Sequence, residues 1–189
     1  MGMIREKLHD LNRVCERVSA SQVYRYEDDA KAAVMKAPSK LVNCTAALAD
    51  NEKVVEIAVN GDGLMLHWAS LRLQNVDKIV EIAVGQNGLA LEFASLRLQD
   101  VDRIVEVAVG QNGLALEFAS KRLQNVYSIV EIAVKQNGKA LKYASKELRN
   151  NPELKALAKA QIAAAKAAKK AAKAAKQTEN ETETTTLSC

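Results

Sequence analysis

A unit of 25 residues repeats along the middle of this chain, and this repeat limits the possible folds more than any other feature. We number its copies as rows 1 to 5, which span residues 26–50, 51–75, 76–100, 101–125 and 126–150. Rows 3 and 4 are identical at 21 of 25 positions, whereas row 1 is a divergent copy with Pro38 where the other rows have glycine. A repeat of this length is typical of a solenoid, in which each copy packs against the next.

Each row is expected to form two short helices joined by a glycine turn. The apolar residues of the first helix recur on one face of a 3.6-residue period. In row 3 they are Ile79, Val80, Ala83 and Val84. Asn75 or Asp77 is expected to cap this helix. Gly88 is expected to end it, because glycine adopts the left-handed conformation at low cost. The second helix is predicted from Leu89 to Leu98.

Helices of about ten residues are marginally stable alone, so the rows should be stable only as a stacked array whose ends are covered. Residues 1–25 contain an amphipathic pattern that predicts an N-terminal capping helix. At the other end, Asn151 and Pro152 are expected to open a capping helix over residues 151–176, because proline is favoured at the first helical position. The sequence therefore predicts an all-α solenoid of antiparallel helical hairpins with a capping helix at each end.

Positions that stay constant across the rows are expected to serve stacking. Recurring charges predict ion pairs between rows, although a stripe that grips a charged partner is the alternative. These charged residues are Glu56, Glu81, Glu106, Glu131, Arg72, Arg97 and Arg122. A recurring aromatic position predicts a core ladder, with a stacking platform for a ligand as the alternative. It is occupied by Trp68, Phe93, Phe118 and Tyr143.

Three positions of the predicted second helix change character between rows, from apolar to acidic to basic. They are spaced at i, i+3 and i+7, and their residues are Leu64, His67, Leu71, Leu89, Glu92, Leu96, Leu114, Glu117, Lys121, Lys139, Lys142 and Lys146. A stacking contact would tolerate such changes poorly, so we expect a partner-binding face here. The alternative is drift on a solvent-exposed face, with solubilising lysines near the end of the array.

The sequence predicts neither an enzyme nor a cofactor or metal site. Glutamates and serines that recur in four equivalent positions offer no single distinctive catalytic group. His9 and His67 have no further ligand at metal-binding spacing. The three cysteines, Cys15, Cys44 and Cys189, form no C-x-x-C pair, and their odd number indicates a reducing compartment.

The C-terminal segment carries the excess charge of the chain. The chain has 27 Lys+Arg and 23 Asp+Glu, of which residues 151–189 hold 7 and 4, so the remainder is nearly neutral with 20 and 19. Residues 152–176 are mostly alanine and lysine, which favour helix. Such a helix can rest on nucleic acid or an anionic membrane, but it lacks bulky apolar residues beyond Ile162, so a solvated spacer is expected. Residues 177–189 are expected not to fold.

Two parts of the chain resemble known bacterial sequences. The segments AVGQNGLALEFAS (83–95) and AVKQNGKALKYAS (133–145) resemble short helical repeats, a domain of unknown function, that are abundant in Legionella effector proteins. The C-terminal tail resembles the signal read by the Dot/Icm type IV secretion system, which has an acidic block, a run of small polar residues and a hydrophobic residue near the end. The matching residues are Glu179, Glu181, Glu183, Thr184, Thr185, Thr186 and Leu187.

The resemblance implies a secreted effector that is made in the bacterial cytoplasm, exported by the secretion machinery and delivered into the host cytosol. There the solenoid is expected to bind a host protein or another effector, and not to catalyse a reaction. The alternative is an adaptor that binds nucleic acid or an anionic membrane through the lysine-rich helix.

Overall fold

The computed structural model describes residues 31–32, 36–38 and 46–186. The predicted N-terminal capping helix, most of row 1, the three cysteines, His9 and Leu187 lie outside these residues. The α-helices are α3 (Ala46–Ala49), α4 (Glu52–Gly61), α5 (Asp77–Gln86), α6 (Asp102–Gln111), α7 (Tyr127–Gln136), α8 (Lys146–Asn150) and α9 (Pro152–Thr186). The 3-10 helices are η2 (Gly63–Trp68), η3 (Leu73–Asn75), η4 (Gly88–Phe93), η5 (Leu98–Asp100), η6 (Gly113–Phe118), η7 (Leu123–Asn125) and η8 (Gly138–Tyr143).

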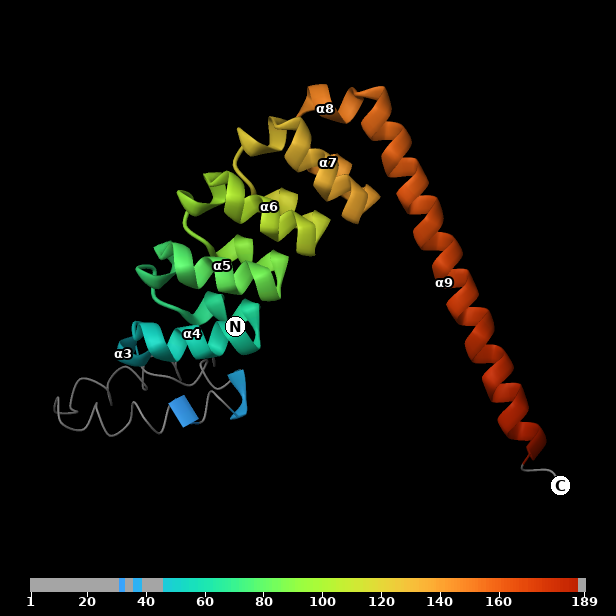
Figure 1. Ribbon diagram of the computed structural model, residues 1–189, viewed down its shortest axis with the longest axis horizontal. Helices are drawn as coiled ribbons and strands as arrows, with labels where there is room; N and C mark the ends of the chain where they lie inside the picture. Colours follow the sequence, from blue (N-terminus) through green and yellow to red (C-terminus); the bar gives the residue numbers. More distant parts are fainter. Residues whose placement is uncertain (1–30, 33–35, 39–45, 187–189) are drawn as a thin grey trace, which may run out of the picture.

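The rows stack into the predicted all-α repeat array. The helices α4, α5, α6 and α7 lie side by side in chain order, and η2, η4, η6 and η8 pack on one another as a second layer (Figure 1). The core lies between the two layers. In row 3 the side chains of Ile79, Val80 and Ala83 are fully buried, and the equivalent positions of rows 4 and 5 are buried as well. The helical period of the first helix was therefore predicted correctly.

The second helix of each row differs from the prediction. In row 3 the 3-10 helix η4 ends at Phe93, and Ala94 adopts an extended conformation with φ −70° and ψ 152°. Two contacts explain the break. The backbone N–H of Ser95 donates to the carbonyl of Gln74 in the preceding row, at 2.9 Å. The side-chain amide of Gln99 donates to the carbonyls at the end of η4, which a continued helix would otherwise satisfy.

The predicted role of Gly88 is also wrong. None of the glycines in the described part of the chain has a positive φ, so Gly88 does not end α5 in the left-handed conformation. Its importance lies in close packing, because a Cβ built on Gly88 would lie 2.2 Å from the carbonyl oxygen of Ala108 in the next row. Gly63 and Gly113 make the same approach to the rows that follow them. The recurring glycine therefore sets the distance between rows.

The predicted cap of the first helix is wrong, because the capping residue is the first of each row. In row 2 this residue is Asn51, which was not predicted, and its side chain accepts from the backbone N–H groups of Lys53 and Val54. In row 3 the capping position of α5 is Val76, which supplies no side-chain acceptor. The side chain of Asn75 instead accepts hydrogen bonds from row 4, as described below.

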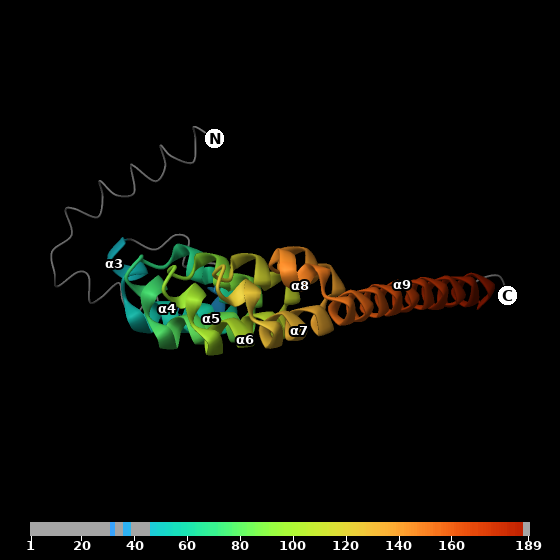
Figure 2. The same ribbon diagram turned by 90° about the horizontal axis from the view of Figure 1, so that it is seen from above.

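The helix α9 covers the open end of the array, as predicted. Asn151 caps it by accepting from the N–H groups of Glu153 and Leu154, at 2.8 and 3.1 Å. Leu154 and Ala158 are buried, and they follow Ile129 and Ala133 of α7 by one repeat length. The first turns of α9 thus occupy the place of a sixth row, and the helix then continues past the array (Figure 2).

The structure also continues α9 to Thr186, although residues 177–189 were expected not to fold. Adding a residue to an existing helix is far easier than nucleating a new one, so the alanine-rich segment can extend the helix into the polar tail. None of the helices in the described residues is both long enough and apolar enough to cross a bilayer.

Candidate recognition surface

The predicted partner-binding face does not lie on one continuous helix, because each second helix breaks after its aromatic residue. The twelve predicted residues still differ from the core in exposure. Leu64, Leu89 and Leu114 are half-buried, and the other nine are exposed. Leu71 and Leu96 stand out, since each has 83% of its surface exposed although both are large and apolar.

Four of the predicted residues meet in one crevice between rows 4 and 5. It has a volume of about 740 Å³, and Glu117, Lys121, Lys142 and Lys146 line it. The sequence prediction missed other residues that line the same crevice, namely Gln124, Asn125, Tyr143, Glu147 and Arg149. The crevice holds four cationic side chains against two carboxylates, so it is the basic end of the predicted face.

Two other predicted residues lie elsewhere. Leu114 and Lys139 line a separate cavity of about 530 Å³ between η8 and α9, together with Ile162, Lys166 and Lys169 of α9. Leu114 and Lys139, which belong to the column that begins at Leu64, therefore line a different cavity from the crevice, which the two columns that begin at His67 and Leu71 reach.

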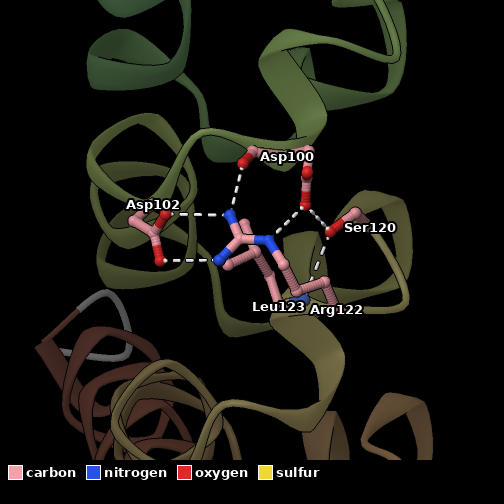
Figure 3. Close-up of polar contacts among 5 residues, drawn as sticks. All are labelled: Asp100, Asp102, Ser120, Arg122 and Leu123. Atoms are coloured by element: carbon pink, nitrogen blue, oxygen red, sulfur yellow. Dashed lines mark hydrogen bonds and ion pairs between the residues drawn. The ribbon is translucent and has the colours of Figure 1, made fainter.

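A repeated set of polar contacts, which we call a rung, joins the end of each row to the next. Between rows 3 and 4, Arg122 donates to the side chain and the carbonyl oxygen of Asp100, at 3.0 and 2.6 Å, and to Asp102 at 2.9 Å (Figure 3). The hydroxyl of Ser120 donates to Asp100 and accepts from the N–H of Leu123 (Figure 3). The hydrogen bond from Ser120 and the guanidinium of Arg122 hold the pKa of Asp100 below its usual value.

The same rung joins the earlier rows. Arg97 reaches Asn75 and Asp77, and Arg72 reaches Asp50. The recurring arginines therefore join successive rows, in agreement with the predicted ion pairs between rows. The recurring serines take part in the same rungs. Two of the four recurring glutamates pair between rows, Glu56 with Lys78 at 2.8 Å and Glu81 with Arg103 at 2.5 Å, whereas Glu131 pairs with Lys135 of its own helix. The Asp or Asn that ends each row was missed, although its recurrence was visible in the aligned rows.

The rung between rows 4 and 5 lacks its cation. Glu147 stands where the earlier rows have arginine, and Tyr127 stands where row 4 has Asp102. The hydroxyl of Ser145 still donates to Asn125, at 2.6 Å. The hydroxyl of Tyr127 donates to Glu153 of α9, at 3.0 Å, and this bond raises the pKa of Tyr127. The basic crevice lies at this incomplete rung, with Asn125, Ser145 and Glu147 in its wall.

The aromatic side chains that recur at one position of each row are only partly buried. Phe93, Phe118 and Tyr143 pack against the core, whereas Trp68 is 37% exposed. The ring of His67 lies 4.6 Å from that of Phe93 and 4.9 Å from that of Trp68. In row 5, the Lys142 ammonium lies 4.4 Å from the centre of the Tyr143 ring. The outer edges of these rings therefore adjoin the variable residues and are available to a partner.

Among the described residues no metal site is found, and the recurring serines make structural contacts. In residues 31–32, 36–38 and 46–186, no three His, Cys, Asp or Glu side chains lie close enough to hold a metal ion. The recurring serine hydroxyls donate to Asp or Asn and accept from backbone N–H groups, as expected for structural residues.

Comparison with known proteins supports the repeat assignment. A family model described as a domain of unknown function, DUF4116, matches residues 51–99 and 103–149, together just over half of the chain. Each matched segment spans two rows, so two of the 25-residue units correspond to one unit of the family. No curated protein and no solved structure matches this chain.

Proposed function

This chain belongs to the DUF4116 family, a domain of unknown function, and we propose that it is a non-catalytic repeat module that binds another protein. One observation carries the proposal. Side chains that serve stacking are nearly constant across the rows. The exposed column that begins at Leu71 changes from leucine to lysine, and the column that begins at His67 changes from histidine and glutamate to lysine, beside an open crevice. An array that held only its own fold would need neither the exposed leucines nor the basic crevice.

The proposed setting is that of a secreted bacterial effector. The support is the likeness of the repeats and the C-terminal tail to Legionella effectors, noted above from the sequence. The partner would be a host protein in the host cytosol, or another effector. Deleting the last dozen residues should abolish delivery into host cells and leave the thermal unfolding midpoint of the array unchanged. Delivery that persists would contradict the role of the tail.

The binding proposal is tested by affinity capture from host lysate with the wild-type chain and with a charge-reversed variant at Lys142 and Lys146, the two lysines of row 5 that line the crevice. We expect a specific host protein that the wild-type chain retains and the variant loses. Capture of a bacterial effector alone would favour a regulatory role toward that effector. Equal capture by both chains would contradict a role of the variable face.

The second candidate is an adaptor that binds nucleic acid or an anionic membrane through α9. The observation in its favour is the run of exposed lysines on the first half of this helix, which are Lys155, Lys159, Lys166, Lys169 and Lys170. Such binding would weaken steeply with salt and disappear on deletion of residues 152–176. Salt-sensitive binding to vesicles or nucleic acid that survives this deletion would exclude α9 as the binding element.

A further inference from the structure

The crevice between rows 4 and 5 and the exposed leucines of rows 2 and 3 form one continuous surface, because they occupy equivalent positions of successive rows. Along one column the residues are Leu71, Leu96, Lys121 and Lys146. Along the neighbouring column they are His67, Glu92, Glu117 and Lys142. Both columns reach the crevice at Lys142 and Lys146. One end of the surface therefore carries the two exposed leucines beside His67 and Glu92, and the other end is basic and hollowed.

The basic end is available to a ligand because the rung between rows 4 and 5 lacks the arginine that closes the gap between rows 3 and 4. Between rows 3 and 4, Arg122 spans the gap and binds the carbonyl and side chain of Asp100. At the next step Glu147 cannot donate such bonds, so the acceptor groups of Asn125 remain at an open crevice. The crevice therefore lies at the step where the arginine contact is absent.

The charges around this cavity favour an anion. Lys121, Lys142, Lys146 and Arg149 line it, against Glu117 and Glu147. Arg149 is held there, because its guanidinium donates to the carbonyl of Lys142 at 3.3 Å. The Lys142 ammonium lies over the Tyr143 ring, and the pKa of Lys142 is raised by its contact with Tyr143, so this side chain stays charged. A carboxylate that entered the crevice would meet several donors at once.

We propose that this surface binds an extended acidic and apolar segment of a partner protein, with its carboxylates in the crevice and its apolar side chains on Leu96 and Leu71. This inference rests on the proposed function, and it adds the chemistry of the partner. Neighbouring helices pack about 8–10 Å apart, and an extended chain rises about 3.3 Å per residue. The acidic and apolar residues of the partner should therefore be spaced by about three residues.

The experiment is a selection of short random peptides on the immobilised full-length chain, followed by fluorescence anisotropy of the selected peptides. We expect a consensus in which acidic residues at one end and two large apolar residues are spaced at about three-residue intervals, in either chain direction. Lys142→Glu with Lys146→Glu should weaken binding by about tenfold or more, because two cations of the crevice are reversed. Leu96→Ser, at a fully exposed position, should also weaken binding and leave the fold intact.

The matched control is Lys166→Glu with Lys169→Glu, which reverses two lysines of α9 that line the separate cavity. This variant should bind the selected peptides as the wild type does. The inference is overturned if no peptide is enriched, if the consensus is not acidic and apolar, or if the α9 variant loses binding and the crevice variant retains it. Failure of the peptides while host-protein capture still depends on Lys142 and Lys146 would reject this segment and leave the proposed function standing.

Discussion

Rows 4 and 5 are identical at 16 of 25 positions. The step from row 3 to row 4 is nevertheless closed by a polar rung, whereas the step from row 4 to row 5 is open. In the closed step, Arg122 joins Asp100 and Asp102 across the gap. In the open step, Glu147 and Tyr127 stand at the corresponding positions, and a basic crevice lies between the rows. The stacking contacts beneath both steps are alike, including the approach of a glycine to the next helix.

The comparison teaches that two layers of each row can change independently. The buried layer fixes the spacing and register of the rows, so it cannot vary without loss of the fold. The outer layer contributes little to stability, because its ion pairs are exposed to solvent. Arginine in row 4 and glutamate in row 5 at the same position of the outer layer are therefore both compatible with the stacked core, although the surfaces above it differ.

The largest effect is expected at the glycines that both steps share. Gly88→Ala and Gly113→Ala should each lower the free energy of unfolding by about 1–3 kcal/mol or more, because the new Cβ would lie 2.2 Å from a carbonyl oxygen of the next row. Gly85 and Gly110 are matched controls with no atom within 4 Å of such a Cβ. Urea unfolding should show that alanine at these two helical positions is neutral or stabilising by about 0.5–1 kcal/mol.

A smaller effect on stability is expected at the side-chain amide that donates to the carbonyls at the end of each 3-10 helix, and it should differ between rows 4 and 5. Gln124 is buried and donates to the carbonyls of Leu116, Glu117 and Ala119, at 3.0 to 3.2 Å. Gln124→Leu should lower the free energy of unfolding by about 1–3 kcal/mol, because buried carbonyls lose their donor. Arg149 occupies the equivalent position of row 5 and is exposed, so Arg149→Leu should cost less in the same urea titration. Equal losses would contradict the difference between the two rows.

The smallest effect concerns the pH dependence of the closed rung. The hydrogen bond from Ser120 and the guanidinium of Arg122 lower the pKa of Asp100, and Arg122 lowers that of Asp102. A lowered pKa adds stability that is fully present above the unfolded value, about 3.9. This stability is lost as the pH falls through the lower folded pKa values. Stability should therefore decline as the pH falls below about 4, and Arg122→Gln should make this decline shallower in urea titrations at successive pH values. An identical decline in both chains would show that the rung does not shift these carboxylates.

Much of the scaffold could be predicted from the sequence. The 25-residue repeat predicted the boundaries of the rows. The helical period predicted buried residues such as Ile79 and Ala83, and the Asn151–Pro152 pair predicted the start of α9. These features depend on contacts within a few residues or on the comparison of aligned rows. They are therefore visible in the sequence itself.

The parts that were predicted wrongly depend on contacts between rows. Apolar spacing is compatible with a helix that continues past Ala94, but the bond from Ser95 to the preceding row and the amide of Gln99 end it. Gly88 was assigned to a turn, whereas its constraint comes from Ala108, twenty positions further on in the next row. Some residues of the crevice were predicted, because the positions of Lys142 and Lys146 visibly change between rows. The role of Glu147 was not, because it becomes clear only when the contacts of Arg122 are known.

The most direct test of the open step is the affinity of Glu147→Arg for the selected acidic peptides. This exchange adds positive charge and restores the donor that Arg122 provides in the closed step. If the crevice itself is the site, the substituted side chain fills it, and affinity should fall by about tenfold with no loss of thermal stability. Affinity that is unchanged or increased would show that charge alone attracts the peptide and would contradict the account.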